Sequence, residues 1–387
     1  MTNIFVIDRI GYDEIFDGVE LLNEDKLFYV VNKSNASKVN NQYLQELNII
    51  DSNDFEEIER VFLDTHTRHP IDHVIALSEK HQELAGKFLD IIKGVDENQR
   101  IAKIFRDKVE MKKHLSAFDI RVPEFGHVSG GLSLFEKYGK IVIKPLDGMG
   151  SENIHIIDNK ILLLELLNNP EINNSTYECE EFIDGELVHI DSVVIDGEIK
   201  VHRVSLYSNN SADFNEYSFW SSFNIDDDDL SMFNSDVIKA MGLVSGVTHL
   251  EVFRKSNGEI VFCEIAKRAG GAGIVDVTEI VTGVNLRTVD TSLYLSRPYS
   301  IKKQSAKYSG WLIAYGKNGV VENISTPEDF NDDWIAKCEI KAALGELISE
   351  PKFSTDEIAQ WIVTGDTQDE VSHRINDIKH RFILEVN

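Results

Sequence analysis

The stretch that decides the fold runs from Val247 to Ile265, VTHLEVFRKSNGEIVFCEI, and it predicts a β-hairpin. Two runs rich in β-branched and aromatic residues flank Asn257-Gly258, a dipeptide typical of a two-residue hairpin turn. Equal steps outward from such a turn place Glu251 opposite Glu264. The sequence therefore predicts two carboxylates side by side on one face of an antiparallel sheet.

This pair of glutamates suggests a metal site. The two-residue period of a strand puts Phe253 and Phe262 on the same face, so we expect the carboxylates to be partly removed from water. Like charges about 5 Å apart are unfavourable unless a cation lies between them or one carboxylate is protonated. Carboxylate oxygens with few other donors suit Mg²⁺, which shares its coordination shell with nucleotide phosphates. A register slip that sends one glutamate to solvent is the alternative.

A cation follows the hairpin in a glycine-rich segment, residues 264–274, EIAKRAGGAGI. Arg268 lies four residues after Glu264, and the three glycines permit a tight crossing of the chain near the metal. A guanidinium at this place suits a phosphate or a substrate carboxylate, because it binds either with two parallel hydrogen bonds. A surface salt bridge is the plainer interpretation.

A second glycine-containing segment, residues 141–157, has the sequence IVIKPLDGMGSENIHII. It is no Walker loop, because its only lysine, Lys144, precedes the glycines. It is no dinucleotide fingerprint, because Asn153 occupies the third glycine position and a strand follows. What remains is a loop between antiparallel strands whose N–H groups close over phosphates while Lys144 reaches the same anion. An ordinary glycine-containing hairpin stays open as the alternative.

Around these two motifs the chain alternates strands and helices. Up to about residue 95 the pattern favours an α/β unit with a partly parallel sheet. Residues 186–207 predict a hairpin with an Asp-Gly turn, so the sheet there should be antiparallel. After about residue 300 we expect a strand in GWLIAYG and a helix in TDEIAQWIV, residues 355–363, and we expect IDDDDL at 225–230 to be a solvated acidic loop.

Composition restricts the function classes. With 66 acidic and 39 basic residues, the formal charge of −27 repels nucleic acid and anionic membrane surfaces. No window has membrane-spanning length and the opening apolar run is short, so we expect a cytoplasmic protein. The three cysteines, Cys179, Cys263 and Cys338, lack zinc-site spacing and predict buried thiols.

Taken in order, these motifs resemble the ATP-grasp superfamily over most of the chain. The motifs are Lys108 on a helix, Lys144 before the glycine loop, ECEEFI at 178–183, and the glutamates in LEVF and FCEIAKR. The segment CEIAKRAGGAGIVDVTEIVTGVNL is similar to the amino-acid ligase branch, whose members join a carboxylate to an amine, often forming dipeptides or modified amino acids in secondary metabolism. The resemblance implies a mixed α/β fold with an N-terminal domain at 1–105, a lid with the glycine loop at 106–182, and a C-terminal antiparallel domain at 183–387.

The resemblance also assigns roles to residues. It implies that Lys108 and Lys144 contact ATP and that Glu251 and Glu264 bind one or two Mg²⁺ ions, with Mn²⁺ as a substitute. Arg268 and Lys144 become the catalytic cations. The implied nucleotide contacts in the loop and hinge are Gly148, Met149, Gly150, Ser151, Glu180, Glu181, Phe182, Ile183 and Glu186.

The chain departs from the family pattern at three places. Ala266 stands where an asparagine often adds a metal ligand, the loop 147–154 has few glycines and no basic residue near its end, and Ala272 is small where some dipeptide ligases carry a bulky residue. The implied partners are small-molecule carboxylate and amine substrates, and a homodimer is compatible with the pattern. No base for the amine is identified, with His249, His189 and His202 as candidates by location.

The resemblance implies an ATP-dependent carboxylate–amine ligase that forms an acyl phosphate and releases ADP and phosphate. One alternative keeps the activation and passes the acyl group to a carrier-protein thiol or a natural-product amine. The other is a nucleotide-binding regulator without turnover, which Ala266 favours and the retained lysines and glutamates oppose.

Overall fold

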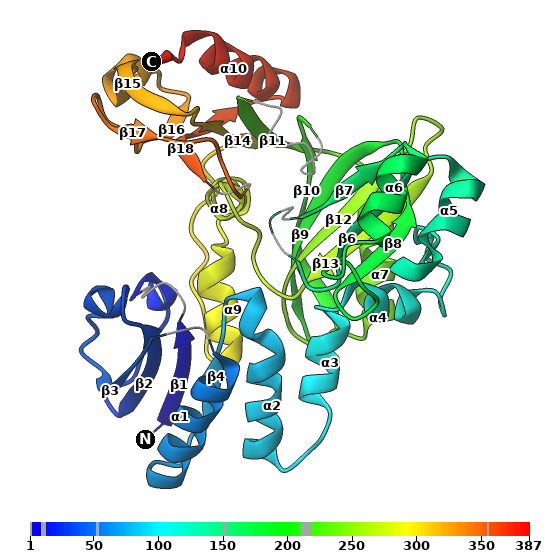
Figure 1. The fold of residues 1–387 in the computed structure, drawn as a ribbon. Coiled ribbons are helices and arrows are strands. Elements are labelled where there is room, and N and C mark those ends of the chain that lie inside the picture. Colours follow the sequence, from blue (N-terminus) through cyan, green and yellow to red (C-terminus); the bar gives the residue numbers. More distant parts are fainter. Residues whose placement is uncertain are drawn as a thin grey trace.

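The computed structural model describes residues 2–8, 13–51, 54–148, 150, 153–209, 218–353 and 356–387. The chain forms three parts, and helix α9 lies near the centre of the molecule, beside the N-terminal part (Figure 1). None of the helices in this described portion is long and apolar enough to cross a membrane.

The N-terminal part is a parallel sheet flanked by helices. Its strands are β1 Thr2–Asp8, β2 Asp25–Asn32, β3 Leu44–Ile50 and β4 His73–Ile75, in the order β3-β2-β1-β4. Helices α1 Phe55–Arg68 and α2 Gln82–Lys93 cover it, and short 3-10 helices occupy Asp13–Phe16, Ala36–Lys38 and Glu79–His81. Stacked Phe62 and Phe88 pack on Phe5 in the core between sheet and helices. The predicted α/β unit is confirmed.

Two short helices lead from this part to the next. Helix α3 spans Asn98–Ile104 and α4 spans Lys108–Leu115. The side chain of Asp107 caps α4 by accepting hydrogen bonds from the N–H groups of Val109 and Glu110. This cap satisfies backbone donors that have no partner inside the helix, and it fixes where the helix begins, with Lys108 in its first turn.

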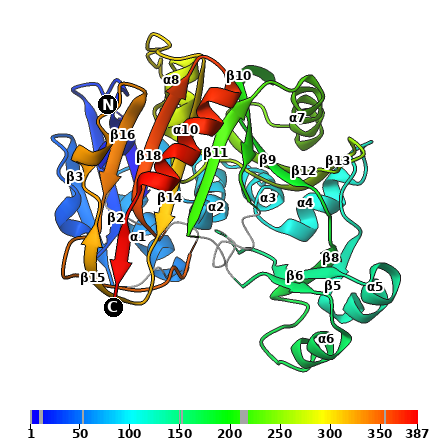
Figure 2. The ribbon, with the colours of Figure 1, turned by 90° about the horizontal axis from the view of Figure 1, so that it is seen from above.

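A small antiparallel sheet follows and projects away from the rest of the molecule (Figure 2). Its order is β5-β8-β6-β7, with β5 Phe125–His127, β6 Ile141–Pro145, β7 His155–Ile157 and β8 Tyr177–Glu181. A 3-10 turn at Val128–Gly130 and helices α5 Gly131–Tyr138 and α6 Lys160–Leu167 cover one face. Leu134, Ile141 and Leu163 form the core between them. We call this part the lid.

The third part is an eight-stranded antiparallel sheet in the order β13-β12-β9-β10-β11-β14-β18-β16. Its strands are β9 Glu186–Ile195, β10 Glu198–Tyr207, β11 Phe219–Ile225, β12 Gly246–Arg254, β13 Ile260–Ala266, β14 Tyr308–Tyr315, β16 Ile335–Ile340 and β18 Glu357–Gly365. A second sheet, β17-β15-β19, comprises Leu347–Ile348, Gly319–Ile324 and Leu384–Val386. The helices are α7 Asp228–Met241, α8 Ile274–Thr282, α9 Leu286–Tyr294 and α10 Gln368–Arg381, with a 3-10 turn at Pro327–Phe330.

The β12–β13 hairpin pairs Glu251 with Glu264, as predicted, but by a different route. Its loop has three residues rather than two, because the Lys255 N–H bonds the Glu259 carbonyl and Gly258 takes a left-handed φ of 85°. This change alone would shift the register by one residue. Cys263 forms a β-bulge that shifts it back.

The bulge overturns one prediction about the faces of this hairpin. Phe262 pairs with Val252 and packs in the core on the far side of the sheet, whereas Phe253 stays on the side of Glu251. The two phenylalanines therefore do not share a face, since the extra residue reverses the alternation beyond it.

Three other sequence interpretations were wrong. Residues 357–365 form strand β18 rather than a helix, because this short apolar run is buried between β14 and β16. The acidic run at 225–230 is not a loop: Asp227 caps α7, whose first turn holds Asp228 and Asp229. Among the cysteines only Cys179 is buried, and all three are free thiols.

Candidate active site

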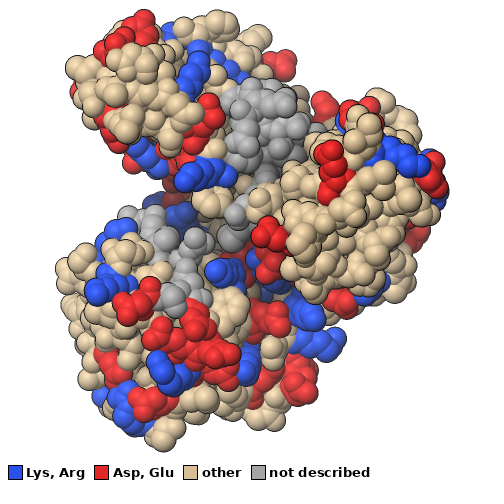
Figure 3. Space-filling view, in the orientation of Figure 1, with Lys and Arg blue, Asp and Glu red and all other residues tan. Residues whose placement is uncertain are grey.

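The three parts enclose a cavity of about 1630 Å³. Its walls come from the ends of β1 and β4, from α4, from the lid strands β6 and β8, and from β12, β13 and α9. Figure 3 shows a hollow between the upper and lower lobes of the molecule, with lysine and arginine side chains visible in it. The cavity contacts every motif that the sequence singled out.

Glu251 and Glu264 face each other across β12 and β13 at this cavity. Glu251 is buried and Glu264 is half-buried. Lys108 at the start of α4 supplies the compensating charge, because its Nζ lies 3.0 Å from Glu264 Oε2. The same Nζ donates to the carbonyl of Gly148 at 2.9 Å. One ammonium thus joins the carboxylate pair to the glycine loop.

The electrostatics of the Lys108–Glu264 ion pair favour the charged form of both side chains. Burial raises the pKa of Glu264, but the charges of Lys108 and Lys144 lower it more, so its pKa falls to about 2. Burial likewise lowers the pKa of Lys108, and the nearby carboxylates of Glu264 and Glu79 raise it above the usual value. Both partners therefore stay charged at neutral pH.

Lys144 belongs to a second buried network beneath the lid. Its Nζ lies 2.5 Å from Glu180 Oε1, and Lys112 of α4 also contacts Glu180. Lys112 lies 2.7 Å from Glu178 as well, so two lysines and two glutamates share one buried cluster. Burial lowers the pKa of Lys144, yet Glu180 raises it well above the ordinary value. Lys144 is therefore a permanent cation at the cavity wall.

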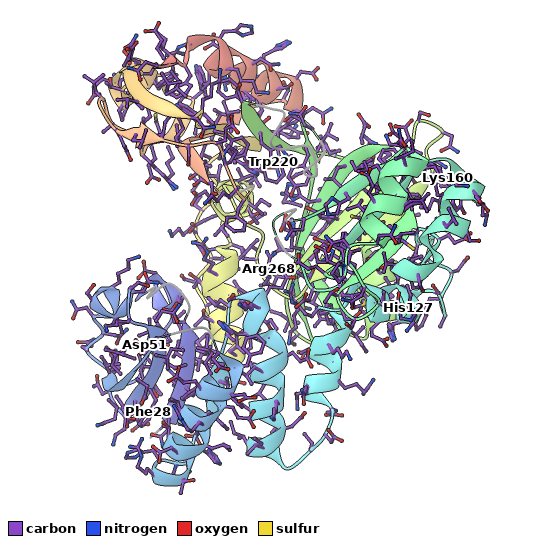
Figure 4. All side chains as sticks on the ribbon, in the orientation of Figure 1. Phe28, Asp51, His127, Lys160, Trp220 and Arg268 are labelled. Carbon is purple, nitrogen blue, oxygen red and sulfur yellow. The ribbon has the colours of Figure 1, made fainter. Side chains whose placement is uncertain are left out.

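Arg268 does not stand free at the site. Its Nη2 lies 2.6 Å from Glu79 Oε2, and Arg106 Nη1 lies 2.5 Å from Glu79 Oε1. Glu79 is buried, and although burial raises its pKa, the charges of Arg268 and Arg106 hold it below the usual range. Figure 4 places Arg268 beside the upper end of α9, on the side that faces the large sheet. Glu79 thus orients two arginines at one wall.

A buried polar chain supports Glu251 from behind. Tyr207 Oη donates to Glu251 Oε1 at 3.1 Å, and His249 Nε2 lies 3.4 Å from the same oxygen. Asp191 bonds both His249 and His189, at 2.9 and 2.6 Å. Burial lowers the pKa of His249, but Asp191 raises it more, to about 10. At neutral pH His249 is therefore protonated, so it donates to Glu251 and cannot act as a base.

The other two histidine candidates serve elsewhere. His189 is buried and bonds Ser222 Oγ at 2.8 Å through its second nitrogen. His202 contacts Ser231 Oγ at 3.1 Å and is not part of the cavity wall.

The loop and hinge residues divide into those at the cavity and those outside it. Gly148, Gly150, Glu180, Glu181, Phe182 and Ile183 line the cavity. Gly150 takes a left-handed φ of 64°, which favours glycine. Met149 and Ser151 lie outside the described residues. Glu186 is not among the lining residues, and it pairs with Arg254 at 2.9 Å instead.

Several residues at the cavity wall or behind it were not predicted from the sequence. They are Glu79 between two arginines, Lys112 and Glu178 behind Lys144, Tyr207 behind Glu251, and Asp290 on α9. Of these residues, the sequence could have revealed Lys112, because it follows Lys108 by four residues and so lies on the same face of α4. The other four depend on partners far away in the chain.

The carboxylate pair fits a divalent cation. Glu251 and Glu264 supply hard oxygen ligands from directly opposed positions, and Mg²⁺ commonly takes one or two protein carboxylates with substrate phosphates completing its shell. Ala266 pairs with His249 on the same ladder and offers no further ligand.

Comparisons with known proteins agree with this geometry. The family model of the ATP-grasp domain matches residues 138–276. The L-arginine-specific L-amino acid ligase of Bacillus subtilis is 26% identical over 336 residues, covering 82% of this chain and 81% of the relative.

Solved structures share the fold. The L-amino acid ligase from Bacillus licheniformis aligns with a TM-score of 0.81 at 18% identity, over 100% of this chain and 99% of that one. The biotin carboxylase domain of the 2-oxoglutarate carboxylase from Hydrogenobacter thermophilus, solved with MgADP, aligns with a TM-score of 0.70 at 16% identity, over 100% and 91%.

The domain match and the fold show that the chain contains an ATP-grasp domain. Over most of its length the chain is also similar to L-amino acid ligases, which are ADP-forming members of that superfamily. ATP-grasp enzymes use ATP with Mg²⁺.

Proposed function

We propose that this chain activates the carboxylate of one substrate with ATP and transfers it to the amine of a second, with an amino acid as at least one of the two. The observation that carries the proposal is the arrangement of Glu251, Glu264 and Lys108 in contact with the glycine loop at one cavity. A binding protein without chemistry would have no need for opposed carboxylates that are partly or fully buried, which are unfavourable unless neutralised.

The reaction has two steps. The substrate carboxylate attacks the γ-phosphorus of ATP, so that a carboxyl oxygen–phosphorus bond forms and the bond to the leaving ADP oxygen breaks. The amine then attacks the acyl carbon, and phosphate leaves. Positioning and charge neutralisation supply most of the acceleration in phosphoryl transfer, so the fixed cations at the cavity are the groups that matter.

We assign the cations by their surroundings. Lys144 stays protonated because of Glu180 and would contact the transferred phosphate from β6. Lys108 lies between Glu264 and the glycine loop and would contact the phosphates from the start of α4. Arg268, held by Glu79, would bind the acyl phosphate or a substrate carboxylate.

For the metal, we propose that Glu251 and Glu264 hold Mg²⁺, which when bound would neutralise charge on the phosphates. Two carboxylates and an alanine at position 266 favour one tightly held ion over two. Tyr207 and His249 keep one oxygen of Glu251 hydrogen-bonded, which fixes the orientation of its carboxylate.

The name of the curated relative gives the first amino acid to try. It is an L-arginine-specific ligase, so arginine heads the substrate panel for this chain. The test is to incubate the protein with ATP, Mg²⁺ and pairs of amino acids, to measure ADP release, and to identify products by mass spectrometry. We expect ADP and a product of the summed mass less water for at least one pair. ADP release with no pair across the panel would argue against ligation.

A further inference from the structure

Asp290 is a buried carboxylate at the cavity that none of the assignments above uses. It lies on α9 and is 2% exposed, yet it is part of the cavity wall. Throughout the described parts of the chain, no salt bridge joins it to a lysine or arginine. Buried carboxylates are usually paired, since an unpaired one is costly to ionise. Asp290 therefore calls for a partner from outside the chain.

Apolar residues flank Asp290 on its helix. Its helix neighbours Leu286 and Val289 pack in the core beside the large sheet. Burial raises the pKa of Asp290 to about 7, and Lys267 and the Val247 N–H lower it only in part. Lys267 is not at the cavity wall, and burial lowers its own pKa. Arg287, which is at the wall one turn earlier on α9, has an interaction of its own.

We infer that Asp290 binds the positively charged side-chain end of one substrate, the guanidinium or ammonium group of a long basic amino acid. The inference rests on the proposed amino-acid ligation and adds a residue that selects the substrate. A guanidinium or ammonium would give the carboxylate the charge-assisted hydrogen bonds that it lacks.

The distance along β12 decides which of the two cationic groups of such a substrate, the α-ammonium or the side-chain end, can contact Asp290. Helix α9 packs against β12, and the Val247 N–H faces Asp290. Val247 lies four residues before Glu251, which is about 13 Å along a strand. The reacting carboxyl carbon or amine nitrogen belongs near Glu251 and Glu264, so Asp290 is far from the reacting atom.

Only the side-chain end can span that separation. In arginine or lysine, six bonds separate the reacting carboxyl carbon from the terminal cation, about 7–8 Å when extended. A hydrogen bond of about 2.9 Å to the carboxylate brings the total to about 10–11 Å, within about 3 Å of the strand estimate. The α-ammonium lies only two bonds from the carboxyl carbon and falls well short.

The test compares arginine with citrulline, which has the same length and shape but no charge. The variants are Asp290→Asn and, as the matched control, Asp356→Asn, which removes a carboxylate at an exposed place on the wall of the same cavity. ADP release gives kcat/KM for both amino acids and for alanine, with one fixed co-substrate. Thermal unfolding shows that each variant is folded.

We expect the unchanged protein to prefer arginine over citrulline by at least about tenfold, and Asp290→Asn to bring the ratio close to one while alanine turnover stays within about twofold. Asp356→Asn should keep the preference. An unchanged ratio in Asp290→Asn would overturn the inference, and so would an equal loss for all three amino acids, which would indicate contact with the α-ammonium or a structural role. If the unchanged protein releases no ADP with any amino acid, the proposed function fails instead.

Discussion

At the scale of single residues, activity should depend most on Glu264. The variant Glu264→Gln keeps the shape of the side chain and removes the charge that contacts Lys108, which is one of the two opposed charges that would hold the metal. We expect ADP release to fall about 100-fold or more, since groups that position charge in the transition state typically contribute that much. Circular dichroism should show an unchanged fold.

The control for this variant lies on the same hairpin. Glu259 is half-exposed at the turn and pairs with Lys255 and Arg121, away from the cavity. Glu259→Gln should therefore leave ADP release within about twofold, because exposed ion pairs contribute little. Normal turnover by Glu264→Gln would show that the metal assignment is wrong.

Residues of the site differ in how far the sequence could reveal them. Lys144 and the two glutamates stand in local patterns, a strand before glycines and a hairpin with a recognisable turn, so their proximity follows from short-range rules. Glu79 reaches Arg268 across 189 residues, and no local pattern contains that pair. Asp290 resembles any polar residue of a helix until α9 is placed at the cavity wall.

At the scale of elements, Asp90 of α2 fixes how α3 starts. Its Oδ1 accepts the Asn98 N–H at 2.8 Å, and its Oδ2 accepts the Gln99 N–H at 3.0 Å. Asp90→Asn should lower the free energy of unfolding by about 1–2 kcal/mol, as for other lost caps. Asp96→Asn, an exposed change in the same turn, should cost under about 0.5 kcal/mol. Urea unfolding measures both, and equal stabilities for the two variants would contradict the cap.

The same carboxylate predicts a pH dependence. Burial raises the pKa of Asp90, but hydrogen bonds from Asn98, Gln99 and Glu97 lower it further, to about 2. Because this pKa is below the unfolded value of 3.8, the stabilisation is complete above about pH 4 and is lost as the pH falls towards 2. The stability gap between the unchanged protein and Asp90→Asn should therefore narrow as the pH is lowered through this range. A constant gap would mean that the carboxylate charge is irrelevant.

The lid is attached to α4 through Lys112. This lysine is fully buried between Glu178 and Glu180, so Lys112→Met leaves two carboxylates with Lys144 alone. We expect a loss of about 3–5 kcal/mol in the free energy of unfolding, since an uncompensated buried charge remains. Adding Glu178→Gln to Lys112→Met should recover part of it.

Its neighbour provides the control. Lys113 is exposed, and its one ion pair within the described residues is with Glu110, so Lys113→Met should change stability by less than about 0.5 kcal/mol in the same urea titration. Equal stabilities for Lys112→Met and the unchanged protein would show that the ion pairs of Lys112 do not stabilise the lid.

Helices and strands were predictable where a turn dipeptide or a sustained hydrophobic period marks them in the sequence. The Asp196-Gly197 turn has left-handed φ at both residues, as a two-residue hairpin turn requires, and β9 and β10 follow from it. The Asn257-Gly258 dipeptide is a similar sequence signal, but of its two residues only Gly258 has a left-handed φ and the loop is longer, so that the bulge at Cys263 was needed to restore the register. Strand β18 shows the limit, because a short apolar run between two other strands has no decisive period.

At the scale of the whole molecule, no single part contains the site. The N-terminal part gives Glu79, the linking helix gives Lys108, the lid gives Lys144, and the large sheet gives Glu251 and Glu264. Contacts such as Lys108 to Gly148 and Arg268 to Glu79 cross from one part to another. Nucleotide bound among these groups would therefore hold the parts together and stabilise the whole chain.

This linkage predicts a dependence of stability on both nucleotide and metal. A non-hydrolysable ATP analogue with Mg²⁺, at about 100 times its dissociation constant, should raise the free energy of unfolding by about 2.7 kcal/mol, seen as a rise of several degrees in the thermal midpoint. Removing Mg²⁺ with a chelator should abolish most of that rise, because the phosphates then meet two unneutralised carboxylates at Glu251 and Glu264. Asp290→Asn should keep the full rise, since Asp290 is assigned to the amino acid and not to the nucleotide. A rise that is independent of Mg²⁺ would separate nucleotide binding from the carboxylate pair and leave Lys108 and Lys144 as its only determinants.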